Sequence, residues 1–249
     1  MSKVYLLNVG ANTNHRATAR SPLFDNDTFL YISFPHPEEP GYRPYPRDVR
    51  RFTRNIDFRY THSDPDWKNL TYGDYCRNPR AAALKNAEVG DILLFWGLLW
   101  RNTGRTWDDF TGEHGWYLIG ALRIIEILEE GQTPKDAKPA NRRRAAKNVH
   151  FYRGVLDPDN RVFIGSLRRS KLFPKAIDLQ ATQGSGLLFR TIRAARGLPL
   201  RRRGKRNWNS SLRPCRVIWD LLDSEQRRRA RIAAKAIFRK TGYDLLREI

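Results

Sequence analysis

Two apolar segments near the middle of the chain constrain its fold more than any other feature. Residues 91–97 and 116–128 are rich in Ile, Leu, Phe and Trp, and a polar segment over residues 102–115 separates them. Apolar runs that are bounded by glycine and polar residues are typical of buried strands. We therefore expect the two runs to pair as the central hairpin of a β-barrel or half-barrel.

Further elements are expected on both sides of this hairpin. Five prolines between Pro35 and Pro46 exclude a helix or a central strand and predict an extended surface loop. A short helix is predicted to begin after Asn78, and the charged segment over 131–144 is expected to be a loop. Short strands are predicted at four other places: residues 4–9, 28–34, 149–152 and 161–164.

The residue pattern between Asp223 and Gly242, near the end of the sequence, predicts a helix. Asp223 or Ser224 is suited to cap a helix that runs to about Lys240, and Gly242 is placed to end it. Small apolar residues recur on one face of this helix and Arg and Lys on the other. The whole pattern predicts an α+β protein, a mixed β-barrel with flanking helices and a basic C-terminal helical extension.

The chain is strongly basic, but its charge is distributed unevenly. It contains 46 Lys and Arg against 26 Asp and Glu, which gives a net charge of +20. Residues 141–249 hold 28 of the basic and 8 of the acidic residues, so the first 140 residues are neutral overall. We expect polyanions to bind the basic part. The predicted division is a domain over 1–190, followed by an Arg-rich segment and helix over 191–249.

Two basic segments are candidate phosphate-binding sites. Arg168, Arg169 and Ser170 follow a predicted strand and offer two guanidinium groups and a hydroxyl. A solvated basic turn explains this first segment equally well. The second segment is an arginine-rich run that contains Arg201, Arg202, Arg203, Lys205 and Arg206.

Several classes of protein lose support. Cys76 and Cys215 are too isolated to indicate a disulfide framework or a Cys-rich zinc site, which favours a reducing cytoplasm. No run approaches the roughly 18 apolar residues of a membrane span, so we expect neither export nor membrane insertion. The sequence has no Gly-rich phosphate loop, no dinucleotide fingerprint, no hydrolase elbow and no histidine pair at metal-binding spacing. No cofactor and no metal are therefore indicated.

The sequence His-Ser-Asp-Pro-Asp is the most unusual polar group in the chain. His62, Asp64 and Asp66 place an imidazole and two carboxylates within five residues. We take them as candidate catalytic residues, with Asp64 or Asp66 as general base or stabiliser of a developing cation and His62 as proton donor or positioner. The same oxygen atoms also suit a bound cation. The alternative is a turn in which the two carboxylates accept hydrogen bonds from backbone N–H groups.

Aromatic and amide side chains supply candidates for base binding. Trp107 lies in the polar segment near arginines, and such pairs form stacking surfaces for bases. Trp116 lies in an apolar run, which favours a core position. Alternation places Asn148, His150 and Tyr152 on one face of a predicted strand, which either lines a pocket or faces water. The full candidate set is Asn8, Asn12, Trp107, His114, Trp116, Asn148, His150 and Tyr152.

Four segments, in their order and spacing, resemble the third nucleotide modification-associated domain family, found in phage and bacterial settings linked to modified DNA. They are Ser21–Asp25 with the proline-rich stretch after it, Thr61–Asp66, Val89–Gly97 and Gly115–Gly120. The resemblance covers roughly residues 3–180. The last two segments also look like those of PUA-like barrels of the ASCH and EVE types, which bind modified bases. The resemblance implies a role around modified DNA bases and leaves the reaction open.

Three functions are compatible with these features. The first is a base-processing enzyme, such as a glycosylase, that acts on modified DNA bases in a DNA-modification or phage-defence setting; the His62 to Asp66 group favours it. The second is a non-catalytic reader that holds a flipped modified base while the Arg-rich segment neutralises phosphates. The third is an RNA-binding protein that relies on its basic tail. The expected partner is double-stranded DNA with modified bases, no membrane partner is expected, and the sequence does not indicate an oligomeric state.

Overall fold

The computed structural model describes residues 2–36, 43–54, 60–179 and 215–247. Its centre is an antiparallel pair of long strands, β7 (Ile92–Asn102) and β8 (Phe110–Leu128). This pair confirms the expected central hairpin. Pairing continues into the polar segment between the two apolar runs, so the connection between the strands is shorter than expected.

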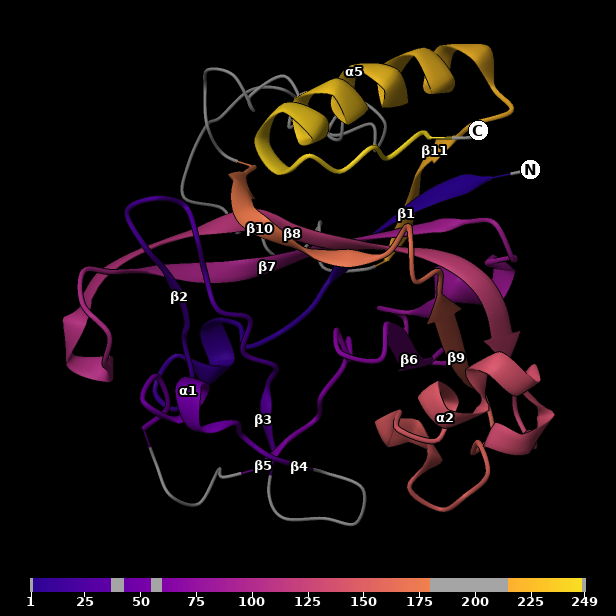
Figure 1. Cartoon of the computed structure of the whole chain (residues 1–249), viewed down its shortest axis with the longest axis horizontal. Helices are drawn as coiled ribbons and strands as arrows, with labels where there is room; N and C mark the ends of the chain where they lie inside the picture. The colour runs from indigo at the N-terminus through magenta and orange to yellow at the C-terminus, as the bar shows by residue number, and fades with distance from the viewer. Residues whose placement is uncertain (1, 37–42, 55–59, 180–214, 248–249) are drawn as a thin grey trace.

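Six further strands extend this pair into one sheet. They are β1 (Lys3–Asn8), β2 (Ser21–Leu23), β6 (Thr71–Tyr75), β9 (Asn160–Gly165), β10 (Lys171–Asp178) and β11 (Arg216–Asp220). The main strand order is β11-β1-β7-β8-β9-β6, with β10 on β8 and β2 on β7. Because β8 pairs first with β10 and then, further along, with β9, the sheet curls along this strand into a half-barrel, as Figure 1 shows.

Short elements surround the curled sheet. Three two-residue strands form a second, small antiparallel sheet: β3 (Pro35–His36), β4 (Arg43–Pro44) and β5 (Tyr60–Thr61). Two short helices are α1 (Arg47–Arg50) and α2 (Arg142–Ala145). Single 3₁₀ turns occupy Thr13–His15, Ala82–Asn86, Trp107–Asp109, Pro134–Asp136, Pro139–Asn141 and Val149–Phe151. The mixed α+β class that the sequence predicted is confirmed.

Strand β7 is buried on both faces, which explains its continuous apolar sequence. Successive side chains of a strand point to opposite sides of the sheet. Leu94 and Trp96 therefore lie on a first face of β7, and Leu93 and Phe95 lie on the second face. The first face packs against the C-terminal helix α5 (Ser224–Thr241), and the second packs against residues of β1, β6 and β9. The sheet therefore separates two apolar cores.

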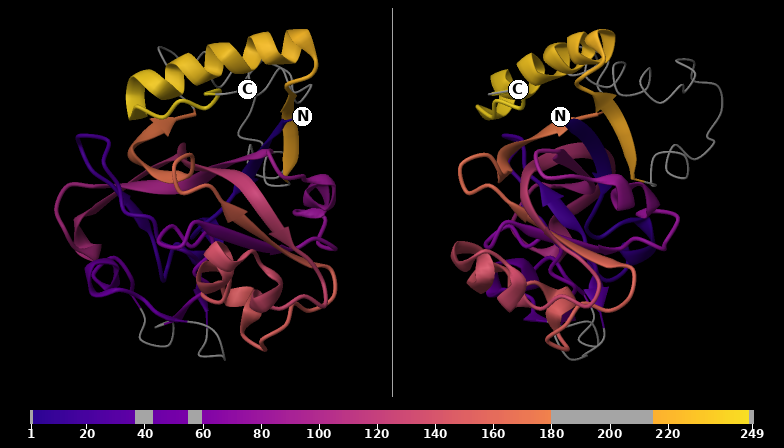
Figure 2. Two further views of the ribbon diagram at one scale, coloured as in Figure 1. Left: turned by 45° about the vertical axis from the view of Figure 1, so that its right-hand side comes forward. Right: turned by 90° about the vertical axis from the view of Figure 1, so that its right-hand side faces the viewer.

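Helix α5 forms as the sequence predicted. The Asp223 side chain accepts a hydrogen bond from the backbone N–H of Gln226, and Gly242 ends the helix with a φ of 66°, a conformation that glycine adopts without strain. In both views of Figure 2, α5 lies across one face of the sheet and α2 lies on the opposite side. Among the described residues, no helix is long and apolar enough to cross a membrane.

Two predicted strands are wrong. Residues 28–34 form only an isolated bridge at Phe29, because the N–H of Ile32 donates to the Ser21 hydroxyl instead of to a neighbouring strand. Residues 149–152 form a 3₁₀ turn, because the Asn148 side chain accepts a hydrogen bond from the N–H of His150 and starts a turn there. The expected polar strand face over this segment therefore does not exist.

Other expectations are refined or lie outside the described residues. The predicted strands at 4–9 and 161–164 are confirmed, and the predicted helix after Asn78 is a 3₁₀ turn. The segment 131–144, expected to be a loop, contains two 3₁₀ turns and the start of α2. The arginine-rich run is outside the described residues, and a domain boundary near residue 190 stays a prediction. Within the C-terminal part, β11 pairs with β1 and α5 packs on the same sheet.

Ile237 and Phe238 offer a matched pair of substitutions in α5. Ile237 is fully buried in the core below the helix, whereas 54% of Phe238 is exposed. We expect Ile237→Ala to lower the free energy of unfolding by about 2–5 kcal/mol, because it removes buried apolar atoms and leaves a cavity. Phe238→Ala should change it by no more than about 0.5 kcal/mol. Urea denaturation measures both values, and equal losses would contradict this packing of α5.

Candidate functional site

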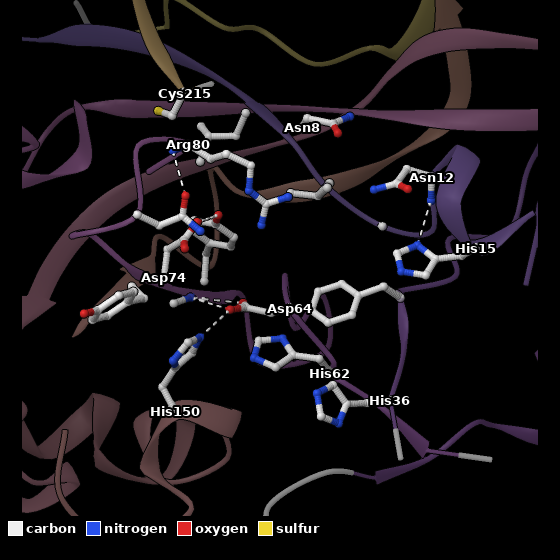
Figure 3. A pocket seen from close by; sticks show the side chains of 18 of the residues that line it. Asn8, Asn12, His15, His36, His62, Asp64, Asp74, Arg80, His150 and Cys215 are labelled. Atoms are coloured by element: carbon white, nitrogen blue, oxygen red, sulfur yellow. Dashed lines mark hydrogen bonds and ion pairs between the residues drawn. The ribbon is translucent and has the colours of Figure 1, made fainter. Parts of the chain in front are cut away.

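A cavity of about 490 Å³ lies beside the apolar core on the face of the sheet opposite α5. Its walls come from segments that are far apart in the sequence: the end of β1 and the loop after it, β3, the chain after β5, β6 and the 3₁₀ turn at Val149–Phe151. Figure 3 labels ten of the residues that line it: Asn8, Asn12, His15, His36, His62, Asp64, Asp74, Arg80, His150 and Cys215.

Asp64 is the buried carboxylate of this cavity, and its position is fixed by three neighbours. The Tyr31 hydroxyl donates to the backbone carbonyl of Asp64 at 2.8 Å. The N–H of Gly73 in β6 lies 3.0 and 2.9 Å from the two carboxylate oxygens. The Nε2 atom of His150 lies 3.1 Å from Asp64 Oδ2. The carboxylate is therefore held in one orientation at the cavity wall.

His150 is positioned by the turn that carries it and by a glycine opposite it. Asn148 starts the turn through its bond to the His150 N–H, and its amide group donates to the Thr71 hydroxyl of β6 at 3.1 Å. A Cβ atom at Gly73 would lie 2.2 Å from His150 Cδ2, so only glycine lets the ring approach the strand this closely. The imidazole of His150 is thus packed between β6 and Asp64.

His62 completes a cluster of three side chains at the cavity wall. Its ring stacks on Phe34 with centroids 4.9 Å apart and lies edge-on to His150 at 5.0 Å. One nitrogen each of His62 and His150 and one oxygen of Asp64 all lie within 4.8 Å of one another. Figure 3 shows the three side chains pointing toward one another. We call these three residues the His62–Asp64–His150 cluster.

The pKa of every member of this cluster is shifted from its ordinary value. Burial raises the pKa of Asp64 to about 7, although the hydrogen bond and charge of His150 act in the opposite direction. Burial, together with the charges of His150 and His36, lowers the pKa of His62 to about 3. Burial also acts to lower the pKa of His150, but its hydrogen bond to Asp64 and the charges of Asp64 and Asp74 outweigh it and raise that pKa. At neutral pH, His62 is therefore neutral.

A second carboxylate lies on the same strand wall. Asp74 in β6 accepts a hydrogen bond from the Tyr72 hydroxyl at 2.5 Å, and burial raises its pKa. The charge of Arg80 acts on Asp74 in the opposite direction. Arg80 is exposed and lines the cavity, so it brings a positive charge to the rim, where a phosphate group would be bound favourably.

Amide groups and an aromatic ring complete the lining. The Asn8 amide donates to the carbonyl of Trp96 at 3.3 Å, and Asn12 is held in the loop after β1 by its N–H bond to His15 Nδ1 at 3.2 Å. Phe34 lies between His62 and His15, whose rings are both stacked against it. Amides that read the edge of a base and an aromatic face that stacks on it are the groups that hold an unstacked base in proteins.

Five of the sequence-based candidates meet in the cavity. They are Asn8, Asn12, His62, Asp64 and His150. Asp66 does not line it, because its carboxylate accepts hydrogen bonds from the N–H groups of Lys68 and Asn69 and from the Asn69 amide, at 3.0, 3.1 and 2.7 Å. Asp66 therefore stabilises a turn through backbone N–H groups, which is the alternative that the sequence left open for both carboxylates. Asp64, in contrast, faces the cavity.

Two further candidates that also fail to line the cavity are Trp116 and Tyr152. Trp116 is buried in the core against Trp96, at a centroid distance of 4.7 Å. Tyr152 is exposed, and its hydroxyl lies 3.4 Å from Asp157. Asn148 is buried behind His150, so it supports the cluster without lining the cavity.

Trp107 and His114 lie near the connection between β7 and β8, outside the cavity. The guanidinium of Arg20 lies over the rings of Trp107 and Trp100, at 4.6 and 4.8 Å from their centroids. His114 stacks on Trp100 at 4.2 Å. The Arg20 guanidinium thus joins Trp107 to the stacked pair of Trp100 and His114 outside the cavity, and a role for Trp107 and His114 in base binding stays a prediction.

The candidate phosphate-binding residues near the end of β9 differ in their surroundings. Arg168 is exposed, and the carbonyl of Arg169 accepts a hydrogen bond from the Tyr243 hydroxyl at 2.9 Å. Ser170 is buried, and its hydroxyl accepts from the N–H of Arg123 at 3.0 Å. The second set, Arg201, Arg202, Arg203, Lys205 and Arg206, lies outside the described residues.

Several residues of the site have only a weak signal in the sequence or none. Gly73 is a lone glycine in a strand, which is a recognised sign of close approach by another group. Phe34, Asp74 and Arg80 have no signal that separates them from ordinary core or surface residues. The proximity of Asp64 to His150 has none either, because 86 residues separate them and only the fold brings them together.

The contact between Gly73 and His150 can be measured with a double-mutant cycle. Gly73→Ala alone should lower the free energy of unfolding by about 1–3 kcal/mol, because the new methyl group overlaps the imidazole. In a His150→Ala background the same change should cost less than about 0.5 kcal/mol, since the ring is gone. Chemical denaturation of the four proteins gives a coupling energy of about 0.5 kcal/mol or more if the contact exists. An additive result would show that the ring does not pack against β6.

Comparison with known proteins places the chain in a family. No curated protein and no solved structure matches it. A family model described as nucleotide modification associated domain 3 matches residues 3–228, a range that includes β1, every wall of the cavity and the first residues of α5. The resemblance found in four sequence segments is thereby confirmed. The chain belongs to the nucleotide modification associated domain 3 family.

Proposed function

We propose that this protein binds a nucleotide of a nucleic acid in the cavity and acts on its base through the His62–Asp64–His150 cluster. The family association supplies the theme of nucleotide modification. The observation that carries the proposal is a buried carboxylate that is hydrogen-bonded to one imidazole and lies within 4.8 Å of a second, at the wall of a cavity of about 490 Å³. Pockets for small ligands occupy roughly 300–1,000 Å³, so a nucleotide is a suitable occupant.

The lining supports a base as the group that is bound. Phe34 offers an aromatic face, Asn8 and Asn12 offer amide groups, and Arg80 offers a charge for phosphate at the rim. A base inside a duplex cannot reach such a site, so the nucleotide has to leave the stack first. Double-stranded DNA that carries modified bases is the partner we propose, with the basic C-terminal part in contact with its phosphates.

The cluster supports processing of the base over passive recognition. A buried carboxylate in a fixed orientation stabilises positive charge that develops on a substrate or is bound beside it. Glycosylase-type cleavage develops such a charge on the sugar. For the fold, we propose a PUA-like barrel, because the β7 and β8 pair and the cavity beside it agree with the resemblance to base-binding barrels.

Product analysis tests this proposal. The full chain is incubated with unmodified DNA, with DNA that carries modified bases and with free nucleotides, and released bases, abasic sites and altered nucleosides are measured by mass spectrometry. We expect a new product from at least one modified DNA. Tight binding with every DNA unchanged would contradict the proposed enzymatic activity and leave a non-catalytic reader of modified bases. The absence of both binding and product would overturn the whole proposal.

Asp64 and Asp66 provide the matched variants for this assay. Asp64→Asn removes the charge at the cavity and should lower turnover by roughly 100-fold or more. Asp66→Asn should retain turnover, because that carboxylate serves a turn outside the cavity. Thermal melting of both variants separates loss of function from loss of fold. Equal loss of turnover in two folded variants would contradict the role given to Asp64.

A further inference from the structure

The geometry points to a divalent transition-metal ion held by the His62–Asp64–His150 cluster. This inference deepens the proposed function, since it gives the same three residues a defined task. It does not depend on any activity toward DNA, because metal binding is measured without a substrate. Two imidazoles and one carboxylate form a ligand set that is typical of Fe²⁺ and Zn²⁺ sites.

The distances within the cluster fit a shared ion. The nitrogen and oxygen ligands of such metals lie about 2.1 Å from the ion, so two neighbouring ligand atoms are about 3.0–3.4 Å apart. His150 Nε2 and Asp64 Oδ2 are 3.1 Å apart. The third ligand atom, on His62, lies within 4.8 Å of both. Two ligand atoms of one ion can be at most about 4.2 Å apart, so the His62 nitrogen has to move closer to the other two ligand atoms when an ion binds.

The surroundings of the cluster resemble the support that metal ligands receive in proteins. Metal-binding carboxylates are themselves hydrogen-bonded, and Asp64 accepts from the backbone of Gly73. His150 is fixed by the turn that begins at Asn148 and by its close packing on Gly73. His62 is backed by the ring of Phe34. Asp64 and His150 therefore already have the spacing of two neighbouring ligands, and His62 is held next to them.

The ion would face the cavity. All three ligand residues line it, and a set of three protein ligands leaves coordination positions for water or for an oxygen atom of a bound nucleotide. The three members come from two segments that are far apart in the sequence: the chain after β5 carries His62 and Asp64, and the turn at Val149–Phe151 carries His150. A third element, β6, supplies the glycine that supports them. The spacing of the histidines in the sequence gives no sign of this site.

Metal binding is tested on the untagged full chain after removal of bound metals with a chelator. Calorimetry with Zn²⁺, Mn²⁺ and Mg²⁺, and anaerobic titration with Fe²⁺, are followed by elemental analysis of the dialysed protein. We expect one transition-metal ion per chain and much weaker binding of Mg²⁺, which prefers oxygen ligands. Wild-type protein that binds none of the transition metals would overturn the inference.

Variants assign the site. His62→Ala and His150→Ala should each weaken binding by about 100-fold or more, whereas His114→Ala, at an exposed histidine outside the cavity, should bind as the wild type does. Co²⁺ absorption spectra of the wild type provide a readout that needs no variant: nitrogen and oxygen ligands give visible d–d bands without the intense near-ultraviolet charge-transfer band of a thiolate. An intense thiolate band would place the ion at Cys215 instead, and unchanged affinity in both folded histidine variants would also overturn the inference.

Metal binding and activity can fail separately. A protein that binds one ion through the cluster but leaves every nucleic acid unchanged keeps the metal site and loses the proposed function. A protein that gives a product equally well after chelation and shows no bound ion keeps the proposed function and loses the metal site. Both results are obtained from the same two preparations.

Discussion

Burial of β7 on both faces is the constraint on which the rest of this structure depends. A strand that is apolar on both sides needs a cover on each side, and the curled sheet provides two cores. Helix α5 covers one face, which leaves the other face for the cavity. The parallel pairing of β1 with β7 then carries the end of β1, with Asn8 and the loop after it, directly to the cavity wall.

The site illustrates how a rigid sheet positions groups that are remote in sequence. β6 lies at the end of the main strand order, and its backbone at Gly73 contacts both Asp64 and His150. One small residue thus donates a hydrogen bond to the carboxylate and leaves room for the imidazole beside it. The buried setting that fixes these groups also shifts the pKa values of Asp64 and His62 far from their ordinary values, and such shifts are concentrated at functional sites.

The sequence predicts the central hairpin and α5 because their signals are local. Two long apolar runs and a cap followed by a stop glycine are each visible within about 20 residues. The segment at His150 was predicted as a strand, since side-chain alternation cannot reveal that Asn148 caps a turn. His62 and Asp64 stand out as unusual residue types, and both reach the cavity. Their partner His150 could be named, but its contact with Asp64 spans 86 residues and depends on the fold.

The central claim is that the His62–Asp64–His150 cluster forms the reactive centre of a nucleotide-binding cavity. A crystal structure of the full chain with a bound modified nucleotide tests it most directly. The account predicts that the base lies against Phe34 and that its reacting atoms face Asp64. A nucleotide bound only at Trp100 and Trp107, on either side of Arg20 near the β7 to β8 connection, with the cavity empty, would contradict it.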